Sequence, residues 1–532
     1  KVLRKLPKGE LDKKAEELTL ASQEAHIQIM FGRPDKAMDI LLPLLKNSTE
    51  YQGNIDLPYF YQISAYCYEL LGEYWQAERY YQSSKALYQK EGTGVSGLQS
   101  STNIASFYLR TGQKGKASEV YKETFHDLDE YIINVYPGLL EEEQLNFSNA
   151  LQDFVDAFFS FSHLYKEEYP ESVALAAKAS ILYKGLIFRF SSARKEAFTN
   201  ELNPTIINQW NKYVQSVNKK ANAYRFPGEL RLDERAEQEE RLLLGLKKPE
   251  VVQDWKEAVK HVAQALNDSS VVIDWVYYEH FERRNLFDEQ DEPKAYYAAI
   301  LYEKGKAPRW IYTLSETDML AAFEHSSSQG VHLAMRGIEE ADEIRGADYD
   351  VLWKPFSPFL KGMKNVYICP TGLLSNFPFH LLKDENQHYL VENYQLVILS
   401  NLLELQSEGQ DALSPDSASV SLLGGAIFNR IPGMKSTQDI PWQYLPGTKK
   451  EVVELHSLLK SFREVQLIQG EEFTEDTLYQ LLNTDILHLA THGYQNDYKP
   501  FGQFFEREDP MLRSGLLASG GNFAWQQDSI LI

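Results

Sequence analysis

The apolar positions of the first 136 residues follow a helical spacing that recurs along the chain. Three segments align without gaps: EAHIQIMFGRPDKAMDILLPLL, SAYCYELLGEYWQAERYYQSSK and IASFYLRTGQKGKASEVYKETF. Gly32, Gly72 and Gly112 occur at intervals of 40 residues, and alanines keep this interval at positions 25, 65 and 105 and at positions 37, 77 and 117. Small residues let two helices approach closely, and a glycine ends a helix, so the pattern predicts a helical hairpin repeated three times.

These hairpins resemble tetratricopeptide repeats, although their period is longer than the usual ~34 residues. The resemblance is to the elongated repeats of kinesin light chains. We expect aromatic side chains to fill the space between the helical layers, at Tyr68, Tyr81, Tyr108 and Tyr121. Such arrays usually bind peptides on a concave face, so the resemblance implies a protein partner on the array or a brace for the next domain.

Residues 137–246 keep a helical pattern but lose the Gly and Ala interval. The segment ESVALAAKASILYKGLIFRF predicts one long buried helix, and LDERAEQEERLLLGL predicts a charged helix that forms one arm of a hairpin. The region around Pro249 and a change to alternating apolar residues mark the next boundary. The sequence therefore predicts a repeat array at 1–136, a further helical region at 137–246 and an α/β domain at 247–532.

The pattern of residue types changes after about residue 268, where β-branched and aromatic residues form short runs. SSVVIDWVYYE, AYYAAILYEKG and PRWIYTLS predict strands, and helical patterns follow at about 316–341 and 348–362. NVYIC predicts a further buried strand that contains Cys369, which we interpret as a packed thiol because no histidine is near it in sequence. The polar segment 406–419, QSEGQDALSPDSAS, predicts a linker.

Beyond the linker, strands and helices alternate in the order SVSLLGGAIF, TKKEVVELHSLLKSF, EVQLIQG, TEDTLYQLLN and DILHLATHG. This alternation predicts βαβ units and a parallel sheet, with Thr474 or Glu475 at the start of the second helix. The fold class is therefore multidomain, with all-α helical repeats followed by an α/β domain whose sheet is mainly parallel. Functional groups of such sheets gather at the carboxyl ends of the strands, where His492 and Gly493 lie.

Composition limits the function classes. The chain of 532 residues carries 54 Lys and Arg against 76 Asp and Glu, a net charge of −22 that opposes direct binding of nucleic acid or an anionic membrane. Its two cysteines, Cys67 and Cys369, form no disulfide framework and are typical of a reducing cytoplasm. No apolar run approaches the ~20 residues of a membrane helix. The absence of a GxxxxGK[ST] loop argues against a repeat ATPase, and the sequence predicts no cofactor.

Three interpretations of His492 are open from the residues alone. It is a satisfied polar residue at a strand end, a zinc ligand together with His488, or a proton-transferring group. Zinc is disfavoured because the sequence has no HExxH helix and no third ligand close by. A catalytic imidazole at this edge takes a proton from a thiol on a neighbouring strand, while Gly493 offers an unobstructed backbone N–H.

The second half of the chain resembles the CHAT domain, a caspase-like cysteine peptidase module often joined to tetratricopeptide repeats. ILHLATHG carries the resemblance, together with SLLGGAIF, LPGTKKEVVEL, DPMLRSGLLASGGNFAW and PTGLLSNFPFHLL. In the last of these, Thr371 stands where the family usually has Asp. The resemblance extends over roughly residues 247–532.

The resemblance implies a cysteine endopeptidase that cleaves a protein substrate, with His492 as general base and acid and the Gly493 amide as oxyanion donor. Neither Cys67 nor Cys369 matches the position of the family's nucleophile, which we expect beyond Ile532. The chain is then a truncated piece of a longer enzyme, or it is a pseudo-peptidase. In either case we expect the 532 residues alone to be inactive.

The resemblance also implies regulation of the peptidase by the repeat array, in a cytoplasmic bacterial signalling or defence role. The alternative is a non-catalytic tetratricopeptide scaffold that binds peptides or partner proteins. The loops beside the site, with Arg430, Lys435, Asp497 and Lys499, give no clear substrate preference.

Overall fold

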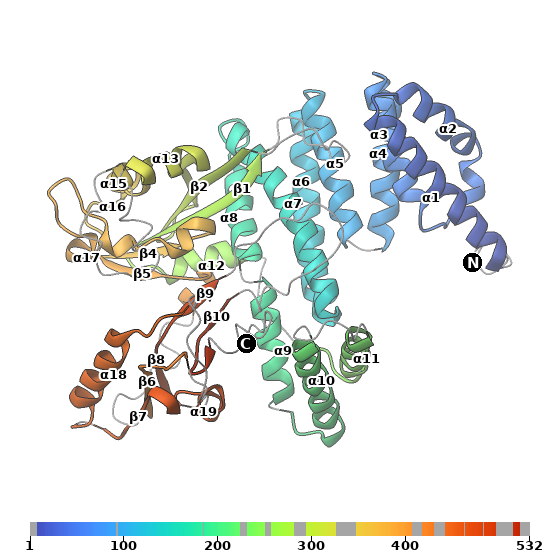
Figure 1. Ribbon diagram of the computed structural model, residues 1–532. Helices are drawn as coiled ribbons and strands as arrows, with labels where there is room; N and C mark the ends of the chain where they lie inside the picture. The colour runs from blue at the N-terminus through green and yellow to red at the C-terminus, as the bar shows by residue number, and fades with distance from the viewer. Residues whose placement is uncertain are drawn as a thin grey trace. The chain divides into compact units, whose positions relative to one another are not determined.

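The computed structural model describes residues 8–91, 94–184, 186–199, 201–223, 231–249, 257–280, 294–325, 347–406, 418–429, 442–461, 463–481, 484–495 and 514–521. It forms two compact units (Figure 1). Unit 1 comprises residues 1–206 and 244–408, and unit 2 comprises residues 207–243 and 409–532. Among the described helices, none has the length and apolar character needed to cross a membrane. The predicted domain boundaries at 136 and 246 stay a prediction.

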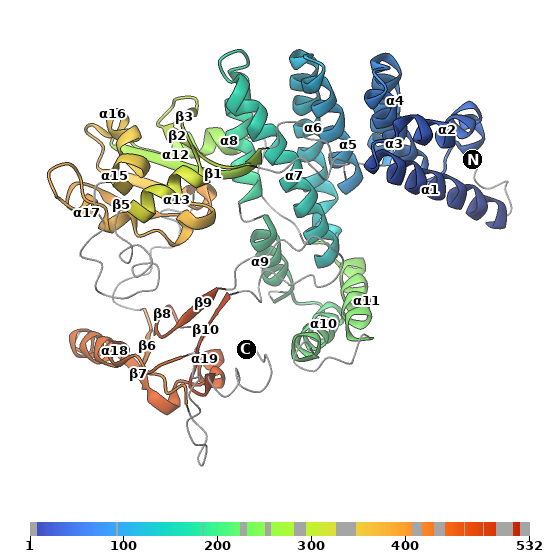
Figure 2. The ribbon, with the colours of Figure 1, turned by 45° about the horizontal axis from the view of Figure 1, so that its top comes forward.

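The front of unit 1 is a stack of antiparallel helices, which Figure 2 shows side by side from α1 to α7. Their bounds are α1 Lys8–Met30, α2 Pro34–Lys46, α3 Leu57–Leu70, α4 Tyr74–Glu91, α5 Val95–Arg110, α6 Lys114–Asn134 and α7 Glu141–Tyr165. The predicted helical region is confirmed. The assignment of these hairpins to tetratricopeptide repeats stays a prediction.

Each of the three predicted glycines closes the first helix of a hairpin. Gly32, Gly72 and Gly112 have φ values of 67°, 77° and 74°, a left-handed conformation that glycine adopts without strain. The closing hydrogen bonds are the same at each turn: Gly72 N–H donates to Glu69 O at 3.0 Å, and Glu73 N–H donates to Tyr68 O at 2.9 Å. The 40-residue interval therefore reflects the same turn, which occurs once in each of the three hairpins.

Replacing Gly72 by alanine should lower the free energy of unfolding by about 1–2 kcal/mol, because a Cβ disfavours the left-handed conformation. No heavy atom lies within 4 Å of the added Cβ, so the expected loss comes from the backbone alone. The matched control is Gly245→Ala, where the Cβ also meets nothing within 4 Å but φ is not positive. Urea unfolding should show a lower midpoint for Gly72→Ala and an unchanged or higher midpoint for the control.

Small and aromatic residues make the interior of the array. The alanines of the two predicted series are fully buried: Ala25, Ala37, Ala65, Ala77, Ala105 and Ala117. The Tyr121 ring packs against Phe154, Phe158 and Phe161 of α7, with centroid distances of 5.7, 5.0 and 5.3 Å. Tyr81 and Tyr108 are buried as predicted. Tyr68 is only partly buried and stacks on Tyr80 at 5.6 Å.

The predicted single helix over 171–190 is wrong, because the chain breaks it in two. Helix α8 runs over Glu171–Tyr183 and α9 over Leu186–Thr199. Lys184 stands between them with φ −68° and ψ 111°, an extended conformation. Its side chain makes buried polar contacts described below, which a continuous helix would not provide.

A five-stranded mixed sheet forms the rest of unit 1, in the order β3-β2-β1-β4-β5. Four of its strands were predicted: β1 Ser270–His280, β2 Lys294–Glu303, β3 Arg309–Ser315 and β4 Asn365–Cys369. The fifth, β5 Gln395–Ile398, was not predicted. Strands β1, β2 and β3 pair antiparallel, whereas β1, β4 and β5 pair parallel. Short helices surround the sheet: α12 Ala258–Ala265, α13 Glu316–His325, α15 Ala347–Leu352, α16 Ser357–Leu360 and α17 Leu390–Asn393.

Both faces of this sheet are covered, as the alternation along β1 shows. Val272 and Val276 share a core with the helical array, whereas Val271, Ile273 and Trp275 share a second core with the helices that follow β3. Figure 1 shows α7 and α8 beside the strands. Helical repeats and sheet therefore form one body in this unit.

A histidine at the contact of α7 with β1 should make unit 1 sensitive to pH. The Tyr278 hydroxyl forms a hydrogen bond with His163 Nδ1 at 2.6 Å. Burial, with smaller contributions from Lys166 and His280, holds the pKa of His163 below its ordinary value. The folded state therefore binds fewer protons than the unfolded chain near pH 6.5, and stability falls as the pH drops through the pKa. Between pH 7.5 and 5, the urea midpoint should fall less in His163→Asn, which keeps an acceptor that does not titrate.

Two antiparallel helices, most of whose residues belong to unit 2, form a hairpin. Helix α10 runs over Pro204–Ala223 and α11 over Arg231–Leu246, and Figure 2 shows them side by side. The Gln209 amide of α10 donates to the Glu239 carbonyl at 3.0 Å and to its carboxylate at 2.7 Å. The predicted hairpin arm is therefore confirmed.

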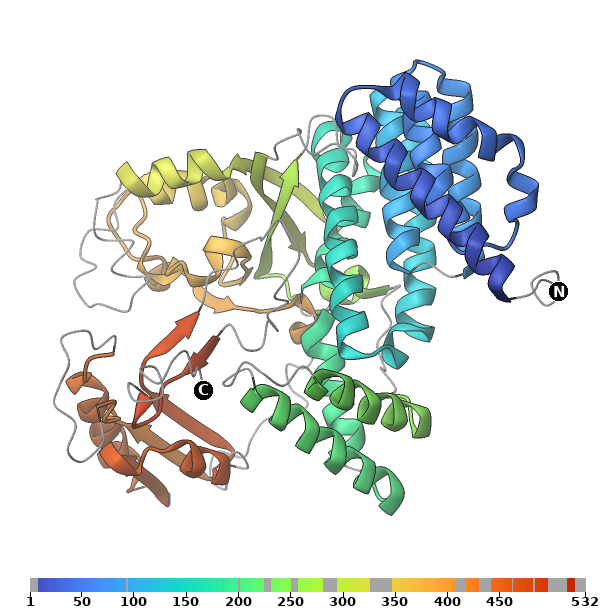
Figure 3. The ribbon, with the colours of Figure 1, turned by 45° about the vertical axis from the view of Figure 1, so that its right-hand side comes forward.

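The other part of unit 2 is a three-stranded parallel sheet in the order β7-β6-β8. Its elements are β6 Val420–Gly424, α18 Pro446–Leu459, β7 Val465–Gln469, α19 Glu475–Gln480 and β8 Ile486–Ala490. They match the predicted order, and Thr474 caps α19 by accepting from Thr477 N–H. A hairpin of β9 Gly493–Gln495 and β10 Ser514–Leu516 follows, which Figure 3 shows beside the sheet.

Candidate functional site

The strand order of unit 2 has a switch point between the carboxyl ends of β6 and β8. Strand β6 is central; the chain passes from β6 to β7 on one side, and from β7 to β8 on the other side of β6. Loops diverge at such a switch point, and ligands of open α/β sheets bind there. The loop after β6 carries Phe428, and the turn after β8 carries His492.

The His492 ring packs against two aromatic side chains and forms a hydrogen bond with one backbone carbonyl. Its centroid is 5.1 Å from Phe428 and 5.2 Å from Trp442. Its Nε2 lies 2.8 Å from the carbonyl oxygen of Gln443. Because a carbonyl only accepts, Nε2 carries a hydrogen, and in the neutral ring Nδ1 is left as the proton acceptor. The contact therefore fixes both the orientation and the tautomer of the imidazole.

Gly493 directs its amide to the open side of the β9–β10 hairpin. Gly493 pairs with Leu516, and Leu517 N–H donates to His492 O at 2.9 Å. In an antiparallel ladder this pattern marks a pair that does not exchange hydrogen bonds, so the Gly493 N–H points away from β10. Gly493 is exposed, and an added Cβ would lie 3.7 Å from Leu516. The structure thus brings an oriented imidazole and an outward amide together on consecutive residues.

A short segment after β10 forms hydrogen bonds with the three segments that follow β6, β7 and β8. The Thr491 hydroxyl donates to Leu517 O at 2.5 Å. Ser519 accepts from Ile427 N–H at 2.9 Å and donates to Gly470 O at 2.7 Å. Residues 517–519 therefore connect the segments that follow β6, β7 and β8 and hold them in one arrangement.

His488 has a role other than the predicted packing. Its Nε2 lies 2.9 Å from a carboxylate oxygen of Glu451 on α18, and the side chain is partly exposed. Since His492 binds Gln443 instead, the two histidines make separate contacts. Sequence reasoning also missed Phe428, Trp442 and Gln443. The aromatic character of Phe428 and Trp442 was an available signal, whereas Gln443, which acts through its backbone, had none.

Neither cysteine of the chain is a reactive thiol. Cys67 lies in the helical array with its Sγ 3.0 Å from Pro34 O, and burial raises the pKa of the thiol to about 12. Cys369 ends β4, and burial, despite the nearby Lys184, raises its pKa to about 12 as well. Both are therefore protonated at neutral pH, in agreement with the interpretation of Cys369 as a packed thiol.

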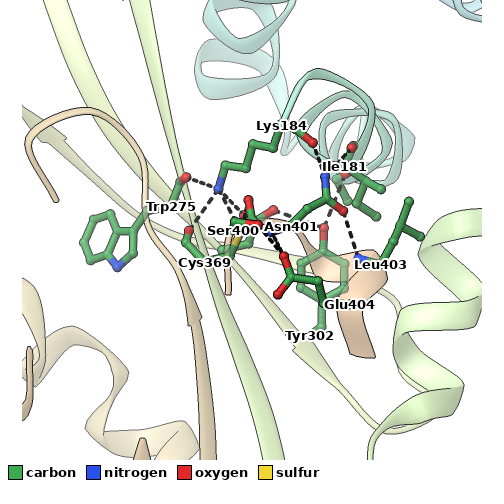
Figure 4. Close-up of polar contacts among 11 residues, drawn as sticks. Ile181, Lys184, Trp275, Tyr302, Cys369, Ser400, Asn401, Leu403 and Glu404 are labelled. Carbon is green, nitrogen blue, oxygen red and sulfur yellow. Dashed lines mark hydrogen bonds and ion pairs between the residues drawn. The ribbon is translucent and has the colours of Figure 1, made fainter. Parts of the chain in front are cut away.

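Cys369 belongs to a buried polar cluster centred on Lys184 (Figure 4). The Lys184 ammonium donates to Asp274 Oδ1 at 2.6 Å, to Trp275 O at 2.6 Å and to Cys369 O at 2.9 Å. The Tyr302 hydroxyl reaches the other oxygen of Asp274 at 3.4 Å. Burial alone would lower the pKa of Lys184, but the charge interactions and hydrogen bonds with Asp274 and Cys369 together outweigh it and raise the pKa. The Lys184 ammonium therefore joins the end of α8 to β1.

Several predicted features lie outside the described residues. They are most of the linker at 406–419, the continuation of the helix after His325, and the side chains of Arg430, Lys435, Asp497 and Lys499. Asn429, the described residue directly before Arg430, is exposed.

Comparison with known proteins gives one family match, which lies in the last third of the chain. No curated protein matches the sequence. The model of the CHAT domain family matches residues 347–529, so the match begins at 347 rather than at the predicted 247. It includes β4, the three parallel strands of unit 2 and the turn with His492 and Gly493. Residues 347–529, about a third of the chain, are thus similar to CHAT domains, which are caspase-like modules related to cysteine peptidases.

Proposed function

We propose that the protein is a cysteine endopeptidase in which His492 transfers protons and the Gly493 amide stabilises the oxyanion. One observation carries the proposal: His492 donates through Nε2 to Gln443 O at 2.8 Å, which leaves Nδ1 as a base at the carboxyl edge of a parallel sheet. The CHAT domain match supports a peptidase-related reaction.

In the proposed reaction, Nδ1 of His492 accepts the proton of a cysteine thiol, and the thiolate attacks the carbonyl carbon of a peptide bond. The carbonyl electrons move to oxygen, and the Gly493 N–H donates to the resulting oxyanion. The imidazolium then returns its proton to the leaving amine as the C–N bond breaks. Water, deprotonated by the same imidazole, cleaves the thioester and restores the thiol.

The nucleophile in this proposal is a cysteine C-terminal to Ile532. Cys67 and Cys369 do not fit the role, since burial raises the pKa of both thiols to about 12. The 532 residues alone should therefore hydrolyse no peptide.

The test compares the 532-residue chain with the full-length protein on a mixture of unstructured peptides, with products identified by mass spectrometry. The full-length protein should cleave peptides, iodoacetamide should stop the cleavage, and the 532-residue chain should be inactive. Cleavage by the 532-residue chain, or cleavage by the full-length protein that survives iodoacetamide, would contradict the proposal.

We also propose that the helical array binds a protein partner that regulates the peptidase. A hollow of about 750 Å³ opens between its helices, lined by residues that include Tyr59, Gln62, Gln99 and Asn103. The Asn103 amide donates to Gln62 at 3.1 Å, so side-chain amides suited to peptide groups line this surface. A cytoplasmic role in bacterial signalling or defence belongs to the same proposal and rests on the resemblance of the chain.

A displayed peptide library selected on the 532-residue chain tests the partner site. Selected peptides should lose at least about tenfold in affinity for Gln99→Trp, which fills the hollow, and none for Lys36→Trp on exposed α2. Equal affinity for both variants would place the partner elsewhere.

A further inference from the structure

A second hollow lies at the carboxyl ends of β6 and β7, beside the candidate catalytic residues. Its volume is about 310 Å³, and it is lined by Gly425, Ile427, Phe428, Asn429, Tyr444, Lys449 and Gly470. This volume is at the lower limit of the ~300–1,000 Å³ of pockets that hold small molecules. The hollow therefore suits one amino-acid side chain rather than a longer ligand.

The lining is mainly apolar. Ile427, Phe428 and Tyr444 give aliphatic and aromatic walls, and Gly470 leaves part of the surface without a side chain. A Cβ on Gly425 would lie 2.8 Å from Cβ of Lys449, so the stem of this lysine packs directly on the glycine backbone. The alkyl part of Lys449 thus extends the apolar wall, and the residue as a whole is exposed.

The hollow shares a wall with the surroundings of His492. The Phe428 ring that lines it lies 5.1 Å from the His492 ring. Tyr444 directly follows Gln443, whose carbonyl oxygen binds His492. A substrate residue whose carbonyl is near His492 can therefore place its side chain, or that of a neighbouring residue, in the hollow.

Hydrogen bonds hold the walls in place without a ligand. Ser519 accepts from Ile427 N–H and donates to Gly470 O, so it joins the two sides of the hollow. Gly520 N–H donates to Ile427 O at 2.9 Å, which fixes the same residue a second time. A preformed site binds its ligand without an ordering cost in the protein.

From these observations we propose that the hollow is a substrate subsite that selects a large apolar side chain, aromatic or long aliphatic, next to the scissile bond. The inference rests on the proposed peptidase function and extends it to the substrate class. Ile427, Phe428 and Tyr444 determine the specificity, and Ser519 positions the walls.

Binding to the 532-residue chain tests the subsite without catalysis. N-acetyl amino-acid amides of phenylalanine, leucine, aspartate and glycine are compared by saturation-transfer NMR. The phenylalanine and leucine amides should bind the natural chain and lose binding to Ile427→Trp, which fills the hollow while keeping the backbone bonds. Ile486→Trp, at the opposite end of β8 and also exposed, should leave binding unchanged. Strongest binding of the aspartate amide would instead assign the hollow to Lys449 and an acidic side chain, and would overturn the proposal.

Cleavage of a peptide library by the full-length protein separates the two claims. One position should show at least about a tenfold preference for large apolar residues over glycine and aspartate. Ile427→Trp should remove this preference while small residues at that position are cleaved at the natural rate. Cleavage with an unchanged preference in Ile427→Trp would overturn the subsite and leave the peptidase standing. Amide binding without any cleavage would support the subsite and refute the peptidase.

Discussion

Replacing His492 by alanine in the full-length protein is expected to lower kcat/KM for peptide hydrolysis by about 10³-fold or more. The variant removes the base that accepts the thiol proton and the acid that protonates the leaving amine. His492→Gln should lose a similar factor, because its amide can still donate to Gln443 O but has no titrating nitrogen. Steady-state kinetics on one cleaved peptide give the measurement.

The matched control is His488→Ala on β8, the strand that precedes His492. His488 binds Glu451 of α18 rather than Gln443, so its loss should change kcat/KM by less than about threefold. Circular dichroism of the three variants should equal that of the natural protein, since all of the positions are partly exposed at the sheet edge. Undiminished hydrolysis by both His492 variants would contradict the proton-transfer role.

The buried ion pair of Lys184 and Asp274 should contribute strongly to stability. Lys184→Met should lower the free energy of unfolding of unit 1 by about 3–5 kcal/mol, because it leaves the Asp274 carboxylate buried without its cation. Asp274 is fully buried, and the Tyr302 hydroxyl at 3.4 Å and the Cys369 thiol, which remain near it, are both uncharged. Urea unfolding monitored by circular dichroism gives the measurement.

Two further variants separate the ion pair from general effects of the substitution. Lys184→Met combined with Asp274→Leu should recover much of the loss, since replacing a whole buried pair by apolar groups is often neutral. Lys354→Met removes a solvent-exposed ion pair with Asp350 and should leave the unfolding midpoint unchanged. A loss as small for Lys184→Met as for Lys354→Met would show that the cluster does not hold α8 against the sheet.

Local sequence patterns predicted the parts of the fold that depend on local physics. The left-handed turns at Gly32, Gly72 and Gly112 follow from a residue type that tolerates positive φ. The alternation of strands and helices after residue 420 predicted the parallel sheet, because parallel strands need crossover connections. The position of His492 at a strand end followed from the same alternation.

Features that depend on distant partners were not predictable in this way. The break after Tyr183 interrupts a segment with continuous helical character, and the Lys184 side chain at the break binds Asp274, 90 residues away. Gln443 acts through its backbone carbonyl, which any residue type supplies, so no sequence signal marks it. The tautomer of His492 follows from that contact and is therefore visible only in the structure.

The central claim is that His492 accepts the proton of a catalytic cysteine. The rate at which iodoacetamide alkylates the reactive cysteine of the full-length protein, measured against pH by mass spectrometry, tests it most directly. In the natural protein the alkylated cysteine should lie C-terminal to Ile532, and its rate should reach half its maximum well below the ordinary thiol pKa of ~8.5. In His492→Ala the half-maximum should move up to about that value. Identical pH profiles in the two proteins would contradict the claim.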